Sequence, residues 1–242
     1  MSFEIIPAID LRDGRVVRLA QGDYDRETRY GADPVELAGK YLAAGARWLH
    51  VVDLDGARAG EIRNGDTIAQ LAASGLQVQA GGGVRAEADI DRLLDAGVQR
   101  VVIGSVAVTM PEKVEKWIES YGSERLCIAL DARFDGAAWT LPVRGWTMPS
   151  AQTLDALAPR FAAAGAQHLL CTDIERDGML SGPNFDLYAH LERLVPTLRV
   201  QASGGVRDLQ DVARLRKTAA AGVILGRSLL EGRLTVQEAL AC

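Results

Sequence analysis

The segment VQAGGGVR, residues 78–85, is repeated almost letter for letter as VQASGGVR at residues 200–207. Each copy is a short apolar run that ends in glycines, and a helix-like segment follows it, at 86–97 and at 208–217. Glycines let the backbone approach a ligand closely, and the start of the following helix offers free N–H groups and a partial positive charge. The two copies therefore predict two anion-binding loops in one parallel α/β fold.

The repeat extends beyond these two loops. Five pairs of identical residues lie 120 to 122 positions apart, namely Gly82 with Gly204, Gly104 with Gly226, Asp10 with Asp131, Asp53 with Asp173, and Asn64 with Asn184. A period of this length exceeds the roughly 20–50 residues of solenoid repeats and fits a duplicated half-domain. We expect one domain over residues 1–242, built from half-barrels at about 1–122 and 123–242.

Eight apolar segments alternate with helical segments along the chain. The expected strands are 3–9, 48–53, 76–80, 100–104, 125–131, 167–173, 198–202 and 220–226. They are continuously apolar, as in a parallel sheet covered by helices. An open doubly wound sheet is the competing architecture, but the duplicated halves, the even number of strands and the chain length favour a closed (β/α)8 TIM barrel. Two polar segments, 11–33 and 132–149, are expected to be long loops over a ligand, the second with a small hairpin.

Composition excludes several classes of protein. The net charge of −5 argues against a surface that binds nucleic acid. No apolar run approaches the roughly 18 residues of a membrane span, and the N-terminus lacks the basic region of a secretion signal. The three cysteines show no paired spacing, which is typical of a reducing compartment. We expect a monomeric cytoplasmic protein that has neither nucleic acid nor a membrane as a partner.

In a barrel of this kind the active site lies at the carboxyl ends of the strands. Asp10 and Asp131 end the first and fifth expected strands, which face each other across the barrel. Glycine loops follow the third and fourth strands and again the seventh and eighth, on opposite sides of the mouth. The sequence thus predicts a substrate that carries a phosphate at each end and is held with its middle next to the two acids. The predicted chemistry is proton transfer that needs no metal.

The aspartates at the strand ends also have ordinary structural interpretations. Asp10 or Asp131 could cap the next segment or pair with an arginine. Asp53 and Asp173 are expected to order loops, because short polar side chains commonly bind the neighbouring backbone.

The arginines and the tryptophan of the loops have two interpretations as well. Arg85 and Arg227 could be surface residues, but arginine beside a glycine loop more often binds phosphate. Trp146 is either a packed anchor or a stacking lid for a flat ring. No metal site is expected, since metal-ligand spacing is absent from the histidines, which are His50, His168 and His190.

Segments along essentially the whole chain resemble one known family. In chain order they are IIPAIDLRDGRVVRLAQGDY, HVVDLDGA, VQAGGGVR, VVIGS, ALDAR, CTDIERDGMLSGPN, QASGGVRD and VILGRSLLEGRLT. The sequence is similar to the ProFAR isomerases of histidine biosynthesis, the phosphoribosylformimino-aminoimidazole carboxamide ribotide isomerases. This resemblance implies an Amadori rearrangement, an aldose-to-ketose isomerisation of ProFAR to PRFAR, with no cofactor.

The resemblance also implies roles for residues at matching positions. Asp10 matches the general base that takes the C2 proton, and Asp131 matches a second carboxylate that acts as an acid or positions the substrate. Thr172 and Asp177 match residues that follow the sixth strand, and Asp177 is a rival for the general acid. Trp146 matches a tryptophan that stacks on the substrate. One implied phosphate site consists of Gly82, Gly83, Arg85, Gly104 and Ser105, and the other of Gly204, Gly205, Gly226 and Arg227.

Three other activities compete with this one. The cyclase of imidazole glycerol phosphate synthase is also a duplicated barrel with paired aspartates, but its relatives carry cysteine where this chain has Ala8. Isomerases that also act on phosphoribosyl anthranilate carry arginine at the position of Arg144, although the rest of that loop resembles the single-substrate branch. The third alternative is a barrel that binds phosphosugars without catalysis.

Overall fold

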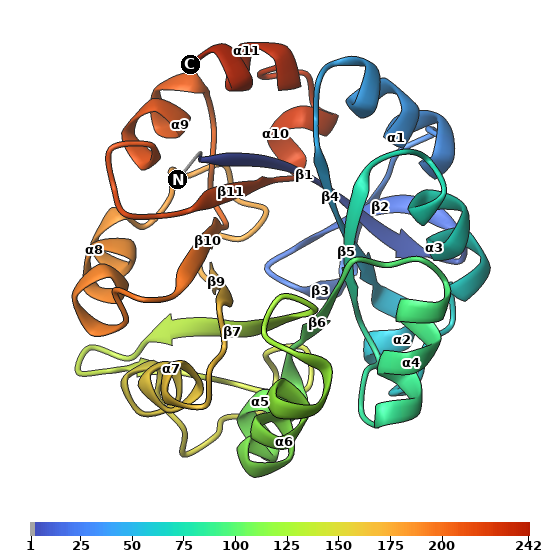
Figure 1. Cartoon of the computed structure of the whole chain (residues 1–242). Coiled ribbons are helices and arrows are strands. Elements are labelled where there is room, and N and C mark those ends of the chain that lie inside the picture. Colours follow the sequence, from blue (N-terminus) through green and yellow to red (C-terminus); the bar gives the residue numbers. More distant parts are fainter. Residues whose placement is uncertain (1–2) are drawn as a thin grey trace.

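The computed structural model describes residues 3–242 and contains a closed barrel of parallel strands surrounded by helices (Figure 1). In order around the barrel, the strands are β1 (Glu4–Arg12), β4 (Trp48–Asp53), β5 (Gln77–Gly81), β6 (Arg100–Ile103), β7 (Leu126–Phe134), β9 (His168–Asp173), β10 (Arg199–Ser203) and β11 (Gly222–Leu225). Strand β11 pairs in parallel with β1 and closes the ring. The prediction of a (β/α)8 barrel is therefore confirmed, and the open sheet is excluded.

Helices cover the outside of the barrel (Figure 1). They are α1 (Pro34–Ala43), α3 (Gly65–Ala72), α4 (Glu87–Asp95), α6 (Pro111–Tyr121), α7 (Leu154–Ala163), α8 (Phe185–Leu194), α9 (Leu209–Leu215) and α11 (Val236–Ala241). Local capping fixes where they begin. Asp33 accepts hydrogen bonds from the N–H groups of Val35 and Glu36, and Pro34 takes the first helical position, so α1 begins there. Among the described residues no helix is both long and apolar enough to pass through a bilayer.

Two glutamines cross the interior of the barrel. Gln79 and Gln201 occupy the same place in the two repeated segments. Their side-chain amides hydrogen-bond to each other in both directions, at 2.7 and 3.0 Å. Because they come from β5 and β10, which stand opposite each other in the ring, they bridge the barrel between its two open ends.

The segment 11–33 is not the loop that its composition suggested. It forms a hairpin of β2 (Arg15–Ala20) and β3 (Asp23–Arg29), and β2 pairs antiparallel with the end of β1. The turn contains Gln21 and Gly22, which both have positive φ, as two-residue hairpin turns require. The loop prediction was wrong because β3, with the sequence DYDRETR, buries neither face, so no alternation of apolar residues marks it.

Shorter elements also follow several barrel strands. In the segment 132–149 a small hairpin forms between the end of β7 and β8 (Trp139–Thr140). Three short helices, α2 (Leu54–Ala59), α5 (Ser105–Thr109) and α10 (Arg227–Leu230), come directly after strands. They have six, five and four residues, which is too short to show helical periodicity in the sequence.

Candidate active site

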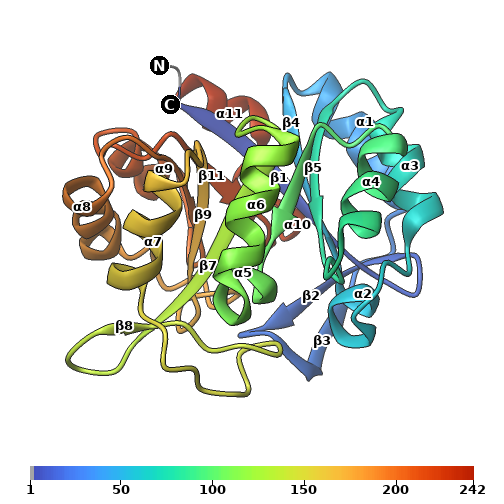
Figure 2. The ribbon, with the colours of Figure 1, turned by 60° about the horizontal axis from the view of Figure 1, so that its bottom comes forward.

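The loops that follow the barrel strands gather at one end of the molecule. Figure 2 shows the β2–β3 hairpin, α2 and β8 at this end, whereas the start of β1 and the C-terminus lie at the opposite end. Asp10 belongs to β1 and Asp131 to β7, and these strands stand opposite each other in the ring. The structure therefore places the two acids on facing strands, near the carboxyl ends.

Arg18, on β2, joins two of the acids. Its Nη1 donates a hydrogen bond to Asp10 Oδ2 at 2.8 Å, and its Nη2 is ion-paired with Asp177 Oδ1. Asp10 and Asp177 are each only 6 % exposed. Burial opposes the charge on the guanidinium, but Asp177 and Asp10 outweigh burial and raise the pKa of Arg18 above its ordinary value. Sequence reasoning missed this residue, because RVVRLA lacks the strict apolar–polar alternation that would have marked a strand.

Asp177 lies in the loop between β9 and α8. Burial raises its pKa, Arg18 lowers it, and the charges of Asp10 and Asp131 raise it again, so that the pKa is about 6. A carboxyl group with this pKa keeps its proton in roughly a tenth of the molecules at pH 7. Asp177 is therefore able to act as a general acid near neutral pH.

Asp131 contacts the tryptophan of the loop after β7. The indole Nε1 of Trp146 donates a hydrogen bond to Asp131 Oδ2 at 2.9 Å. Burial raises the pKa of Asp131, and hydrogen bonds from Trp146 and Thr172 only partly offset this increase. Thr172 is the neighbour of Asp131 on the adjoining strand β9. The indole also covers the hairpin turn, since a Cβ on Gly22 would lie 2.7 Å from the ring. In this structure the indole thus contacts both Asp131 and the turn, and its stacking on a substrate stays a prediction.

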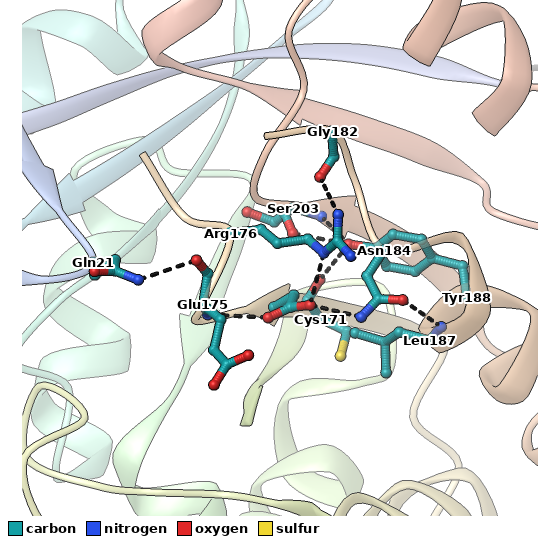
Figure 3. Close-up of polar contacts among 10 residues, drawn as sticks. Gln21, Cys171, Glu175, Arg176, Gly182, Asn184, Leu187, Tyr188 and Ser203 are labelled. Atoms are coloured by element: carbon teal, nitrogen blue, oxygen red, sulfur yellow. Dashed lines mark hydrogen bonds and ion pairs between the residues drawn. The ribbon is translucent and has the colours of Figure 1, made fainter. Parts of the chain in front are cut away.

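The tip of the β2–β3 hairpin is attached to the β9–α8 loop. The backbone N–H of Gln21 donates to the carbonyl of Asp177 at 3.1 Å. The side-chain amide of Gln21 donates to the carbonyl of Glu175 at 3.0 Å (Figure 3). A Cβ on Gly178 would lie 2.7 Å from the carbonyl oxygen of Leu19, so the two backbones are in contact. The hairpin therefore holds Arg18 over the acids.

The glycine loops after β5 and β10 need glycine for two reasons. Positive φ angles between 86° and 104° are found at Gly82, Gly83, Gly204 and Gly205. A Cβ on Gly82 would also lie 2.2 Å from the carbonyl oxygen of Asp53. In the second copy, a Cβ on Gly205 would lie 2.3 Å from the carbonyl oxygen of Gly182. Each loop thus packs directly against the end of the preceding strand–loop unit.

Two short helices stand beside these glycine loops. Helix α5 begins at Ser105 after Gly104, and α10 begins at Arg227 after Gly226, and no side chain caps either start. An uncapped helix start leaves backbone N–H groups available to an anion. Strand β5 is next to β6, and β10 is next to β11. The structure therefore brings the residues of the two expected phosphate sites together in two groups.

The two arginines of these groups contact neighbouring loops. Arg85 is exposed, and its guanidinium lies against Gly60 at the end of α2, where a Cβ would come within 2.2 Å of it. Arg227 donates through Nη1 to the carbonyl of Gly178 at 2.5 Å and through Nε to Glu231 at 2.6 Å. Arg227 therefore helps to hold the β9–α8 loop as well.

Asp53 and Asp173 order the loops that follow their strands, as the sequence suggested. Asp53 accepts hydrogen bonds from three backbone N–H groups at 2.7 to 2.9 Å and from the side-chain amide of Asn64 at 2.6 Å. Asp173 accepts a hydrogen bond from Asn184 Nδ2 at 2.7 Å. Asn184 in turn accepts from the N–H of Leu187 and caps α8 (Figure 3). The two repeated pairs thus share the hydrogen bond from asparagine to aspartate, whereas only Asn184 caps the following helix with its side chain.

The histidines hydrogen-bond to residues other than the acids at the mouth. Each contacts one polar neighbour, and the pairs are His50 with Gln79, His168 with Glu124, and His190 with Asp155. Across residues 3–242, no group of three or more His, Cys, Asp or Glu side chains is arranged to hold a metal ion.

A family model described as histidine biosynthesis protein matches residues 4–235 of the chain. The chain belongs to this family. A relative from Xanthomonas euvesicatoria pv. vesicatoria (strain 85-10) is 57% identical over 244 residues, and one from Stenotrophomonas maltophilia (strain K279a) is 57% identical over 248 residues. Each match covers 100% of this chain and 100% of the relative.

These relatives of the histidine biosynthesis protein family share one name. Both are called 1-(5-phosphoribosyl)-5-((5-phosphoribosylamino)methylideneamino) imidazole-4-carboxamide isomerase. The resemblance to the ProFAR isomerases, which the sequence motifs indicated, is thereby confirmed.

Proposed function

We propose that this chain is a ProFAR isomerase, which converts ProFAR to PRFAR by an Amadori rearrangement in histidine biosynthesis. The observation that carries the proposal is the position of Asp10 and Asp131 on facing strands, between two groups of glycine loops and uncapped helix starts. A substrate with a phosphoribosyl group at each end suits this arrangement, because each group of loops can bind one phosphate. The names of the full-length relatives support the same activity.

The first chemical step needs an acid that protonates the ring oxygen of the furanose, so that the ring opens to a Schiff base. We assign this role to Asp177, because its pKa of about 6 allows a buried carboxyl group to carry a proton near neutral pH. Asp131 is the alternative acid. Its Oδ2 already accepts a hydrogen bond from Trp146, which suits a group that positions the substrate.

The second step needs a base at C2. We assign this role to Asp10, which removes the C2 proton beside the Schiff base; the electrons move toward the nitrogen, and the resulting enolamine becomes the aminoketose. Arg18 holds Asp10 and Asp177 side by side, so that the base and the proposed acid act on neighbouring atoms of one substrate. Trp146 exchanges its contact with Asp131 for stacking on the substrate's flat ring.

The proposed activity also implies how the substrate is bound and in which environment the enzyme works. The two loop groups bind the two phosphates of a small bisphosphate, and no cofactor takes part. We also propose a monomeric cytoplasmic enzyme with no nucleic acid and no membrane as a partner. The net charge of −5 and the unpaired, buried Cys127 and Cys171 support this environment. Size-exclusion chromatography with light scattering measures the oligomeric state.

Mixing the purified protein with ProFAR alone tests the activity, because the rearrangement changes the absorbance of the substrate. Turnover without ammonia and without a glutaminase excludes the cyclase. Asp10→Asn should lower kcat by about a hundred- to ten-thousandfold while the bisphosphate product still binds. If the unaltered protein gives no absorbance change, the proposal is wrong. If Asp10→Asn turns over normally, Asp10 is not the base.

Arg144 supports a second candidate substrate, phosphoribosyl anthranilate. This arginine is exposed, has a φ of 54°, and lies two residues before Trp146 in the loop after β7. Its guanidinium is a suitable partner for the carboxylate of anthranilate. A direct assay with phosphoribosyl anthranilate decides the matter, and the absence of a detectable rate would end the dual-substrate hypothesis.

A further inference from the structure

A polar pocket lies at the end of the barrel opposite the candidate active site. Its walls include the residues that begin several strands, among them Trp48, Arg100, His168 and Arg199. The pocket has a volume of about 190 Å³. This is far more than the roughly 15 Å³ that a single water molecule needs. Gln201 also lines the pocket, so the glutamine pair stands between this pocket and the acids at the other mouth.

The pocket carries more positive than negative charge. Its walls include three arginines and two glutamates, in a chain whose net charge is −5. Glu4 lies 3.8 Å from Arg47, and Glu124 accepts a hydrogen bond from His168 at 3.0 Å. His168 adds no charge near neutral pH, because burial above all lowers its pKa to about 4. One arginine charge in the pocket is therefore left without a matching glutamate.

Arg100 and Arg199 share this excess positive charge, because the charge of Glu124 acts on both of them but forms an ion pair with neither. Arg100 is 6% exposed, its Cζ lies 4.2 Å from the centroid of the Trp48 ring, and its Nη1 donates to Gln79 Oε1 at 3.2 Å. The Nε of Arg199 is buried without a hydrogen-bond partner in the described part of the chain. Within residues 3–242, neither arginine has a carboxylate at ion-pair distance. Arg100 also donates through Nε to the carbonyl of Glu124 at 3.4 Å, but it has no ion pair there. Burying this cation without a carboxylate, and the Arg199 Nε without an acceptor, is unfavourable, and an anion between the two arginines would offset both penalties.

We propose that this pocket binds a small oxyanion of the phosphate type between Arg100 and Arg199. A guanidinium group forms paired hydrogen bonds with phosphate oxygens, and stacking on Trp48 fixes the plane of one guanidinium in advance. Two cations that face one cavity suit a doubly charged ion better than a singly charged one. The site is separate from the glycine loops, which lie at the carboxyl ends of the strands.

An NMR titration of isotope-labelled protein with inorganic phosphate tests this proposal. The indole N–H of Trp48 reports on the pocket, whereas that of Trp146 reports on the opposite mouth. With the ionic strength held constant by chloride, we expect the Trp48 signal to shift in a saturable way. In Arg199→Gln the dissociation constant from this signal should rise by about tenfold or more, because a charged hydrogen-bonding partner is lost. The response of Trp146 should not change.

Arg193→Gln is the matched control, since Arg193 is exposed on α8 and does not line the pocket. It removes the same charge and should leave the titration of Trp48 unchanged. Arg199→Lys keeps the charge but not the forked donors of arginine. Its dissociation constant for phosphate should therefore lie between those of Arg193→Gln and Arg199→Gln. The proposal is wrong if the Trp48 signal does not move, moves equally with chloride alone, or titrates alike in Arg199→Gln and Arg193→Gln. Turnover is not measured, so the outcome is independent of the isomerase activity.

Discussion

Replacing Asp177 by asparagine should make the stability of the protein less dependent on pH. Folding raises the pKa of Asp177 from 3.8 to about 6, chiefly through burial. A group whose pKa is raised by folding stabilises the native state fully below its unfolded pKa, and this stabilisation is lost as the pH rises through the folded pKa. For Asp177 the loss between pH 5 and pH 8 is about 1.4 kcal/mol. Asparagine keeps the shape and can still accept a hydrogen bond from Arg18, but it does not titrate.

Urea unfolding of both proteins at pH 5 and at pH 8 measures this effect. Groups that do not interact with Asp177 titrate alike in the two proteins, so the difference between the two pH-dependent losses reports on Asp177 and on the two acids coupled to it, Asp10 and Asp131. We expect the free energy of unfolding of the unaltered protein to fall by about 1.4 kcal/mol more than that of Asp177→Asn. An equal fall in both proteins, or a larger fall in the variant, would refute the raised pKa and with it the role of Asp177 as the acid. The same variant should lose about a hundredfold or more in kcat.

Four further substitutions test the site and the packing around it. Arg18→Gln removes the cation between Asp10 and Asp177, so the pKa of the catalytic acid should rise by about 1 to 3 units. The pH dependence of kcat/KM measures this pKa, and an unchanged profile would contradict the role of Arg18. Gly82→Ala should destabilise the protein by about 2 kcal/mol or more, because its φ is 104° and the new Cβ meets a backbone oxygen at 2.2 Å. Gly39→Ala is the control, because Gly39 lies in α1 with open space around it, and it should stabilise the protein by about 0.5–1 kcal/mol. Urea unfolding measures both changes in stability, and a change of the same sign in the two variants would contradict the packing argument. Trp146→Phe removes a hydrogen bond that lowers the pKa of Asp131, so NMR titration of this carboxyl group should give a higher pKa, and an unchanged value would show that the contact is absent in solution.

The barrel could be predicted because its strands are buried on both faces and are therefore apolar throughout. The β2–β3 hairpin could not, because β3 buries little of its own surface and shows no periodic pattern. The hairpin is fixed instead by contacts far along the chain, through Gln21 to the β9–α8 loop and through Gly22 to Trp146. Such contacts leave no local signal in the sequence.

The same limit applies to the candidate site. Asp10 and Asp131 could be identified because each ends a barrel strand, and strand ends are visible in the sequence. Arg18 could not be singled out among 27 lysines and arginines. Its place follows from the antiparallel register that sets Val17 opposite Asp10, and from the docking of the hairpin that brings it to Asp177.

The sequence alone determined that this chain forms a barrel and which glycines and acids follow its strands, because strand burial, helix capping and strand ends depend on neighbours close along the chain. Only the tertiary structure decided how acidic those groups are and which cations they meet. The reason is that a pKa depends on burial and on charges within a few ångströms, and the ion pair between Arg18 and Asp177 joins residues 159 positions apart.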